Sequence, residues 1–284
     1  YDVDGKLPNI ALMKLSSYHK QQGDEVRLCL PLEFRLFDRI YASSIFTYSS
    51  KEYVTRDMVC GGTGFDIKSC LPSEIDDCDH DYTLYPDFKQ AIGFLTRGCI
   101  RKCPWCFVPE KEGYIKPYRS IEQVAQGRKE VILLDNNVLA HSHGLQQIER
   151  IVELGLKVDF NQGLDARLIN GEVAKLLSKV RWLRPLTMAC DNEGMIEPVV
   201  KAAELLRRCG CKPQRYTVYV LVEDVPSALR RVTVLKKHNL DPFAQPFRNK
   251  RGDEPSKEIR AFARWVNHKA IFKSVSWEEY SRKM

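Results

Sequence analysis

The chain has 284 residues, which is enough for one large domain with a smaller attachment and for a sizeable buried core. Hydrophobic residues make up 44% and charged residues 29%, as in an ordinary globular protein, and no apolar run approaches the roughly 18 residues that span a bilayer. The net charge of +7 comes from scattered lysines and arginines, so nucleic acid is a minority interpretation. A miniprotein and a helical membrane protein are excluded.

The chain contains ten cysteines, and its first residues show neither a basic leader nor an apolar segment of secretory type. Such cysteine usage favours reduced thiols and metal ligation over a framework of disulfides. We therefore expect a protein of the reducing cytoplasm that does not associate with membranes.

Residues 1–87 predict a small Rossmann-like α/β domain and a linker. A helix is expected to begin near Pro8 and to end at Gly23, leading directly into a strand. Further strands are expected within residues 37–46 and 57–65. The acidic stretch that follows is poor in periodicity and is interpreted as the connection to the main domain.

From residue 88 to residue 250 the sequence alternates short apolar runs with amphipathic stretches such as residues 144–155 and 195–210. Six strands alternating with helices indicate parallel pairing with right-handed crossovers. The strands are expected at residues 91–96, 130–135, 157–162, 184–190, 215–222 and 241–247. The spacing suits an open sheet or a partial (β/α)6 TIM-like barrel, with residues 251–284 forming a C-terminal helix and tail that pack on it.

Three cysteines, Cys99, Cys103 and Cys106, follow the first of these strands with gaps of three and two residues. Thiolates bind iron–sulfur clusters or zinc. A four-iron cluster with three protein ligands keeps one iron open to a small molecule, whereas a structural zinc ion needs a fourth ligand. No cysteine or histidine elsewhere makes a second close pair of finger type. The alternative that remains is a zinc-stabilised nucleic-acid-binding protein.

This spacing, with Trp105 and Phe107 flanking Cys106 and the loop leaving the first of six strands, resembles the radical S-adenosylmethionine (radical SAM) superfamily. The resemblance implies that the three cysteines hold one [4Fe–4S] cluster and that S-adenosylmethionine chelates the open iron. It also implies a radical SAM enzyme that cleaves the cofactor reductively to a 5′-deoxyadenosyl radical, which abstracts hydrogen from the substrate. The two aromatic residues are expected beside the cofactor.

The resemblance further implies an electron donor such as flavodoxin or ferredoxin as a partner. It leaves the substrate open among small molecules, peptides and nucleic acids. The resemblance also leaves open which reaction follows radical formation.

In the superfamily, the second strand usually ends in a Gly-Gly-Glu-like motif that binds the amino group of the cofactor. Asp135, Asn136 and Asn137 stand at that place here, which departs from the motif but supplies oxygen acceptors for an ammonium group. The alternative for these three residues is a plain turn.

By the same resemblance, Gln162 and Asp165 are expected to take the ribose hydroxyls, and Arg167 is expected to bind the cofactor carboxylate. In a competing interpretation Asp165 caps the next helix and Arg167 forms a salt bridge. Asp191 at the fourth strand end is expected to face the same cavity, and Gln245 after the sixth is expected near the adenine.

The N-terminal unit, with the run Gly61–Phe65 after a strand, is similar to a truncated cobalamin-binding domain. The loop that supplies an axial histidine in many such domains is absent, and the glycines are accounted for by a tight turn. We therefore expect a degenerate domain that supports the barrel, with cobalamin as the less favoured alternative.

Overall fold

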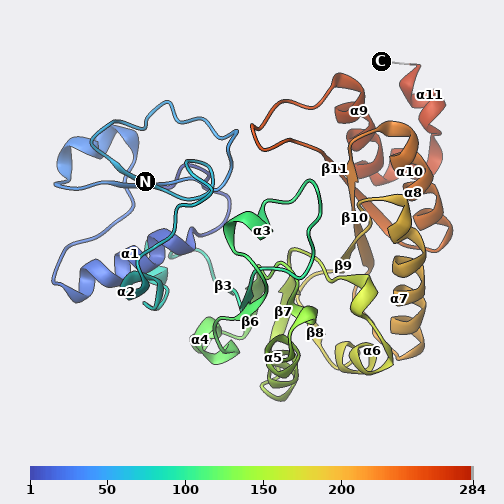
Figure 1. Ribbon diagram of the computed structural model, residues 1–284, viewed down its shortest axis with the longest axis horizontal. Coiled ribbons are helices and arrows are strands. Elements are labelled where there is room, and N and C mark those ends of the chain that lie inside the picture. The colour runs from blue at the N-terminus through green and yellow to red at the C-terminus, as the bar shows by residue number, and fades with distance from the viewer. Residues whose placement is uncertain (283–284) are drawn as a thin grey trace.

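The computed structural model describes residues 1–282 as a mixed α/β fold, shown in Figure 1. The predicted parallel α/β architecture is confirmed, because all six expected strands form and pair in parallel with their neighbours. They are β3 (Ala91–Gly93), β6 (Glu130–Leu133), β7 (Lys157–Phe160), β9 (Leu186–Ala189), β10 (Tyr216–Val222) and β11 (Asp241–Pro246).

The six strands are divided between two sheets. One has the order β3-β6-β7-β8, where β8 is the two-residue strand Arg181–Trp182, and the other has the order β11-β10-β9. An isolated parallel bridge between Leu164 and Met188 joins them, with the Leu164 N–H donating to the carbonyl of Thr187 at 2.8 Å. Strands β3 and β11 stand at the outer ends and do not pair with each other, so the described chain forms no closed barrel.

Five helices cover one face of these sheets, as the alternation of the strands requires. They are α4 (Ile121–Ala125), α5 (Ser142–Glu153), α6 (Gly171–Leu177), α7 (Ile196–Arg208) and α8 (Val225–Lys237). In β10 every second residue from Tyr216 to Val222 is buried in the core that the helices share with the sheets. The intervening side chains lie on the opposite face, which we call the inner face and which carries Asp159, Thr187, Tyr219 and Phe243.

The N-terminal unit consists of α1 (Ile10–Gln21), η1 (Pro31–Leu36), β1 (Tyr41–Ser43), β2 (Val59–Gly61), α2 (Ser73–Asp76) and η2 (Tyr82–Leu84). The helix expected after Pro8 is confirmed, with Asn9 as its N-cap, and the two later strands form a parallel pair. The strand expected directly after the helix is wrong, because residues 24–30 form no strand. Pro31 instead opens a 3-10 helix, since proline suits the first position of a helical turn.

Helix α1 packs on the inner face at the β3 edge of the sheet. Its Leu12 and Met13 share a small hydrophobic core with Ile92 of β3 and Ile132 of β6. A separate core within the unit surrounds Ala42 of β1. The unit therefore has its own core and also covers part of the main sheet, and the boundary at residue 87 stays a prediction.

Lys14 of α1 is a buried lysine that ties this unit to the main domain. Its Nζ donates to the Asp76 carbonyl at 2.5 Å, to Asp76 Oδ1 at 2.7 Å, and to the hydroxyl of Tyr118. Burial lowers the pKa of Lys14, while the Asp76 carboxylate opposes that shift. Because a buried charge is tolerated only with such partners, this network fixes α1 against α2 and against the segment after the cysteine loop.

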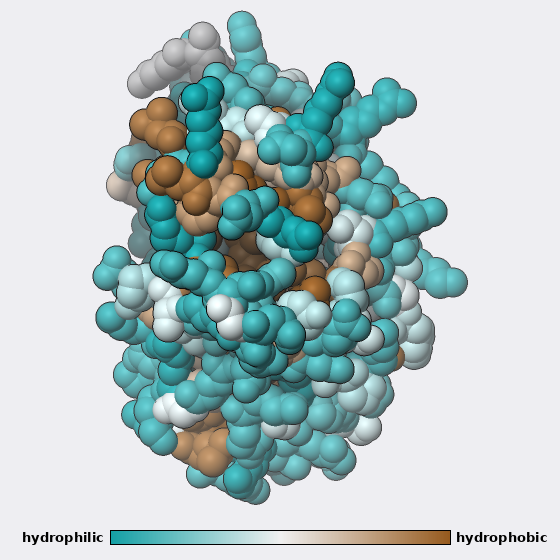
Figure 2. Space-filling view, turned by 90° about the vertical axis from the view of Figure 1, so that its left-hand side faces the viewer, coloured by the Kyte–Doolittle hydropathy of each residue, from teal (hydrophilic) through white to brown (hydrophobic). Residues whose placement is uncertain are grey.

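Figure 2 shows that hydrophobic side chains gather in the upper half of the face that the N-terminal unit presents, around a hollow. Leu32 in η1 is 99% exposed and Leu36 is 72% exposed. Val59 of β2 is half exposed as well. The described chain leaves this apolar surface uncovered.

The C-terminal segment forms three helices, α9 (Lys257–Asn267), α10 (Lys269–Ser274) and α11 (Trp277–Ser281), which pack through a cluster of aromatic rings. The Asn267 side chain accepts from the Ala244 N–H at 2.8 Å and donates to the Ala244 carbonyl at 2.9 Å, which satisfies the edge of β11. Residues 283–284 of the expected tail lie outside the described residues. No described helix combines the length and the apolar character needed to cross a membrane.

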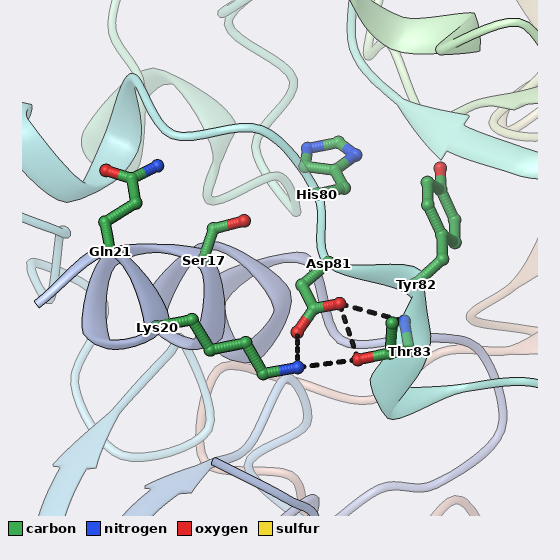
Figure 3. A pocket seen from close by; sticks show the side chains of 7 residues that line it. All are labelled: Ser17, Lys20, Gln21, His80, Asp81, Tyr82 and Thr83. Carbon is green, nitrogen blue, oxygen red and sulfur yellow. Dashed lines mark hydrogen bonds and ion pairs between the residues drawn. The ribbon is translucent and has the colours of Figure 1, made fainter. Parts of the chain in front are cut away.

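A shallow hollow of about 520 Å³ lies between α1 and the linker and is drawn in Figure 3. The Lys20 ammonium donates to Asp81 and to Thr83, both at 2.7 Å, on one side of it. None of the site residues predicted from the sequence lines this hollow. His80, which does line it, is almost fully buried, and its Nδ1 has no hydrogen-bond partner among residues 1–282.

His80 is expected to make the protein acid-sensitive. Burial, aided by the charges of Lys14 and Arg119, lowers the pKa of His80 to about 4, so the unfolded chain binds more protons between that value and the ordinary 6.5. The part of the folding stability that depends on neutral His80 is therefore fully present above pH 6.5 and is lost as the pH falls toward 4. We expect the free energy of unfolding to fall by about 3 kcal/mol over this window, as measured by urea titration.

A His80→Gln variant should lose this part of the pH dependence. His238→Gln serves as the control, because the His238 side chain is 40% exposed and lies 3.8 Å from Glu204. Equal pH profiles for His80→Gln and the unchanged chain would refute the assignment.

Candidate metal centre

The three cysteines lie on one loop at the carboxyl end of β3. The loop leaves β4 (Thr96–Arg97), passes through α3 (Val108–Lys111) and returns to β5 (Lys116–Pro117), which pairs antiparallel with β4. Figure 1 shows it above the ends of β3 and β6. Gly98 opens it with φ +86°, and a Cβ there would lie 2.5 Å from the Tyr114 carbonyl oxygen, so only glycine fits this close approach.

The three thiols are half-buried, and two of them accept hydrogen bonds from the loop backbone. The Arg101 N–H donates to Cys99 Sγ at 3.3 Å, and the Val108 N–H donates to Cys106 Sγ at 3.4 Å. Burial raises the pKa of Cys103 and of Cys106, and the neighbouring thiols add to the rise at both. The charges of neighbouring thiols thus act on Cys103 and Cys106, which indicates that the sulfur atoms of the loop lie near one another.

Within residues 1–282, no three His, Cys, Asp or Glu side chains converge closely enough to hold a single metal ion. Cys60 and Cys70 are exposed, and the buried Cys78 donates to the Glu74 carbonyl at 3.3 Å. The zinc alternative therefore has no support from the geometry. A four-iron cluster places each thiolate on a different iron, so its ligands need not meet around one ion.

Asn137 is the predicted site residue that lies beside a cysteine. Its Nδ2 donates to Cys99 Sγ at 3.6 Å and to Asp165 Oδ2 at 3.2 Å. Its Oδ1 is buried and, in the part of the chain described, accepts no hydrogen bond. Such a buried unpaired acceptor costs about 1–3 kcal/mol, and a donor such as an ammonium group placed against Oδ1 would satisfy it.

Asp135 is buried and fully engaged by the start of the loop. Its carboxylate accepts from the Leu95 N–H at 3.1 Å, from the Thr96 N–H at 2.5 Å and from the Thr96 hydroxyl at 2.7 Å. Burial raises the pKa of Asp135 to about 6 against these hydrogen bonds. The carboxylate thus anchors the cysteine loop to the end of β6, and its expected contact with a cofactor amino group stays a prediction.

Glu112 was not anticipated from the sequence, although it organises the loop. Its carboxylate accepts from the Gly98 N–H and the Arg97 guanidinium, both at 2.7 Å, and from Asn136 Nδ2 at 2.9 Å. These partners lie 14, 15 and 24 residues away in sequence, so no local pattern marks the residue. Glu112 joins the two ends of the cysteine loop to the end of β6.

Asp165, at the end of β7, holds two arginines beside the cysteines. It accepts from Arg101 Nε at 3.0 Å and from Arg167 Nε at 2.7 Å, and it caps η4 (Ala166–Leu168) through the Arg167 N–H. Burial works to raise the pKa of Asp165, but the two arginines together lower it. The competing interpretation, a helix cap with a salt bridge, is what the structure shows, and the predicted contacts with the ribose and the carboxylate stay predictions.

The other predicted residues are spread along the same edge of the sheets. Asp191, after β9, is near enough to raise the pKa of Cys103 and Cys106, and burial raises its own pKa. Gln162 and Gln245 are exposed on the loop after β7 and on β11. Trp105 is half-buried in the cysteine loop and Phe107 is 42% exposed, so both aromatic residues are accessible from solvent.

No family model matches the chain, and no curated protein matches its sequence. Among solved structures it is similar to Streptococcus suis SuiB bound to the precursor peptide SuiA, with TM-score 0.46 and 11% identity over 64% of this chain and 45% of that one. It is likewise similar to SuiB bound to S-adenosylmethionine, with TM-score 0.46 and 11% identity over 66% and 48%. The chain thus spans about half the length of these neighbours. So distant a likeness says nothing of what this chain binds.

Proposed function

We propose that the chain is a radical SAM enzyme that binds one [4Fe–4S] cluster through Cys99, Cys103 and Cys106. The observation that carries this proposal is the three-cysteine loop at the carboxyl end of the first of six parallel strands, with the unpaired Asn137 acceptor beside Cys99. When bound, the cluster and S-adenosylmethionine supply a 5′-deoxyadenosyl radical that abstracts hydrogen from the substrate. We interpret the two sheets as a partial barrel around this reaction.

In this proposal the chain's own residues bind and orient the cofactor. Asn137 Oδ1 accepts from the amino group, and its Nδ2 stays on Cys99 and Asp165. Arg167 binds the carboxylate, because its side chain is 37% exposed and its guanidinium keeps donors beyond its pair with Asp165. Gln162 serves the ribose and Gln245 the adenine.

We also propose that residues 1–87 form a supporting unit without cobalamin, that residues 88–250 form the catalytic domain, and that residues 251–284 pack on it. Helix α1 and the Lys14 network hold the first unit against the sheet, which supports that role. The enzyme would act in the cytoplasm with an electron donor such as flavodoxin or ferredoxin.

Anaerobic reconstitution of the full chain tests the proposal. We expect about four irons and four sulfides per chain, broad visible absorbance, and 5′-deoxyadenosine after reduction in the presence of S-adenosylmethionine. Bound zinc without sulfide, together with steeply salt-dependent binding of RNA or DNA, would instead support the alternative.

A further inference from the structure

Where α1 does not cover it, the inner face of the sheets carries the buried polar residues Asp159 and Thr187 and exposed residues on β11. Asp159 stands in register with Ile132 of β6, which α1 buries. Within residues 1–282, the core that α1 makes on this side does not include β9, β10 or β11. Phe243 of β11 is 41% exposed and Gln245 is also exposed. The opposite face of the same strands is apolar and closed by helices. A face that carries polar groups and is exposed along β11, opposite a closed apolar one, is the side on which a ligand can be received.

Asp159 is a buried carboxylate that interacts with the Asn161 side chain and keeps one oxygen, Oδ2, without a hydrogen bond from the described residues. The residue is 3% exposed, and its Oδ2 accepts no hydrogen bond from residues 1–282. A buried acceptor without a donor is costly, and native proteins rarely leave one without a role. Burial raises the pKa of Asp159, which Arg184 opposes.

Arg184 covers this carboxylate without satisfying it. Its guanidinium lies 3.5 Å from Asp159 Oδ2, beyond good hydrogen-bond length, and its side chain is 51% exposed. A half-exposed arginine is free to turn, so a ligand can reach the carboxylate while the guanidinium takes a second group of the same ligand. The pair offers one acceptor and one donor side by side.

Two aromatic rings continue the row across the sheet. Tyr219 and Phe243 are register partners on β10 and β11, with their ring centroids 5.9 Å apart in an edge-to-face arrangement. The Tyr219 hydroxyl donates to the Asn161 carbonyl at 3.0 Å, which holds the ring across the sheet toward β7. The ring faces supply apolar contact for a planar ligand next to the polar pair.

We infer that the Asp159–Arg184 pair and the Tyr219–Phe243 pair form the substrate subsite, and that it takes a nucleobase bearing an exocyclic amine. Such a base donates its amine to Asp159 Oδ2, accepts from Arg184 at an adjacent ring nitrogen or carbonyl, and lays its face on an aromatic ring. The inference rests on the proposed function in one respect, namely that the substrate binds to the same strands as the cofactor. Asp165, which follows β7 and contacts Asn137, lies six residues beyond Asp159.

Binding of matched nucleosides to the full chain tests this subsite. Cytidine and uridine differ by an amine in place of a carbonyl, and guanosine differs from inosine by one amine. We expect the aminated member of each pair to bind about tenfold more tightly or better in isothermal titration calorimetry. The measurement is made with and without the cluster, so that nucleoside binding and cluster loading are scored separately.

Three variants test whether Asp159 and Arg184 form the nucleoside site. Asp159→Asn should abolish the preference for the amine, since an amide presents both a donor and an acceptor. Arg184→Gln should weaken the binding of both nucleosides in each pair. Arg215→Gln is the matched control. Arg215 stands just before β10, as Arg184 stands just before β9, and its side chain is 58% exposed and lies 3.3 Å from Asp241. It should bind as the unchanged chain does. Circular dichroism confirms that each variant is folded.

Three results would overturn the inference. Equal affinities within each pair, or no binding of any nucleoside, would show that no amine-reading site exists. An amine preference that survives Asp159→Asn would place the site elsewhere. A chain that loads the cluster and forms 5′-deoxyadenosine but binds no nucleoside would fail this inference and leave the proposed function standing.

Discussion

Exchanging Cys99, Cys103 or Cys106 singly for alanine is expected to reduce the iron retained after reconstitution and desalting by about tenfold or more, with loss of 5′-deoxyadenosine formation. Each thiolate would hold one iron, and the loop has no fourth cysteine that could replace a lost ligand. Backbone donors already face Cys99 Sγ and Cys106 Sγ, so these sulfur atoms are oriented before metal binds. Iron and sulfide assays together with absorbance spectra measure the effect.

The chain supplies its own controls for this prediction. Cys60→Ala and Cys70→Ala remove exposed thiols of the N-terminal unit and should leave the iron content unchanged. All three loop thiols are only half-buried, so the variants should remain folded, with the free energy of unfolding changed by about 1 kcal/mol at most. Full iron content in any loop variant would remove the basis of the proposed function.

Short apolar runs that alternate with amphipathic stretches were sufficient to predict the strands and their parallel pairing. In β10, for example, the sequence shows the apolar run from Tyr216 to Val222, whereas the burial of every second residue is seen only in the structure. The strand expected after α1 failed because an apolar run preceding Pro31 has no partner to pair with. Packing of α1 on Ile92 and Ile132 was not predictable, since it joins segments about 80 and 120 residues apart.

For the site, the sequence predicted the cysteine loop but not how it is held. Asn137 lies beside Cys99 as the motif position suggested, whereas Asp135 turns to the Leu95 and Thr96 backbone. Both residues are short polar side chains after β6, and only the backbone path decides which one faces the cysteines. Long-range contacts such as those of Glu112 have no signature in one sequence.

Glu112→Gln is expected to loosen the cysteine loop while leaving the core of the protein intact. A glutamine keeps one acceptor and turns a donor toward the Gly98 N–H or the Arg97 guanidinium, so at least one charge-assisted hydrogen bond is lost. Loss of such a bond costs about 1.5–3 kcal/mol, which corresponds to about tenfold to a hundredfold faster amide exchange for residues 98–113. Hydrogen-exchange mass spectrometry of the full chain measures this, and iron loss from the reconstituted protein should accelerate in parallel.

Glu110→Gln is the matched control, because Glu110 lies in α3, which Glu112 caps, is 44% exposed and pairs with Lys250 at 2.5 Å. Exposed pairs of this kind contribute about 0–1 kcal/mol, so loop exchange and iron retention should stay close to those of the unchanged chain. Exchange in the helices behind the sheets, such as α5 and α7, should be the same in both variants, since Glu112 contacts neither. If Glu112→Gln accelerates exchange throughout the chain, the residue stabilises the whole fold; if it accelerates none, the three hydrogen bonds do not hold the loop that presents the cysteines.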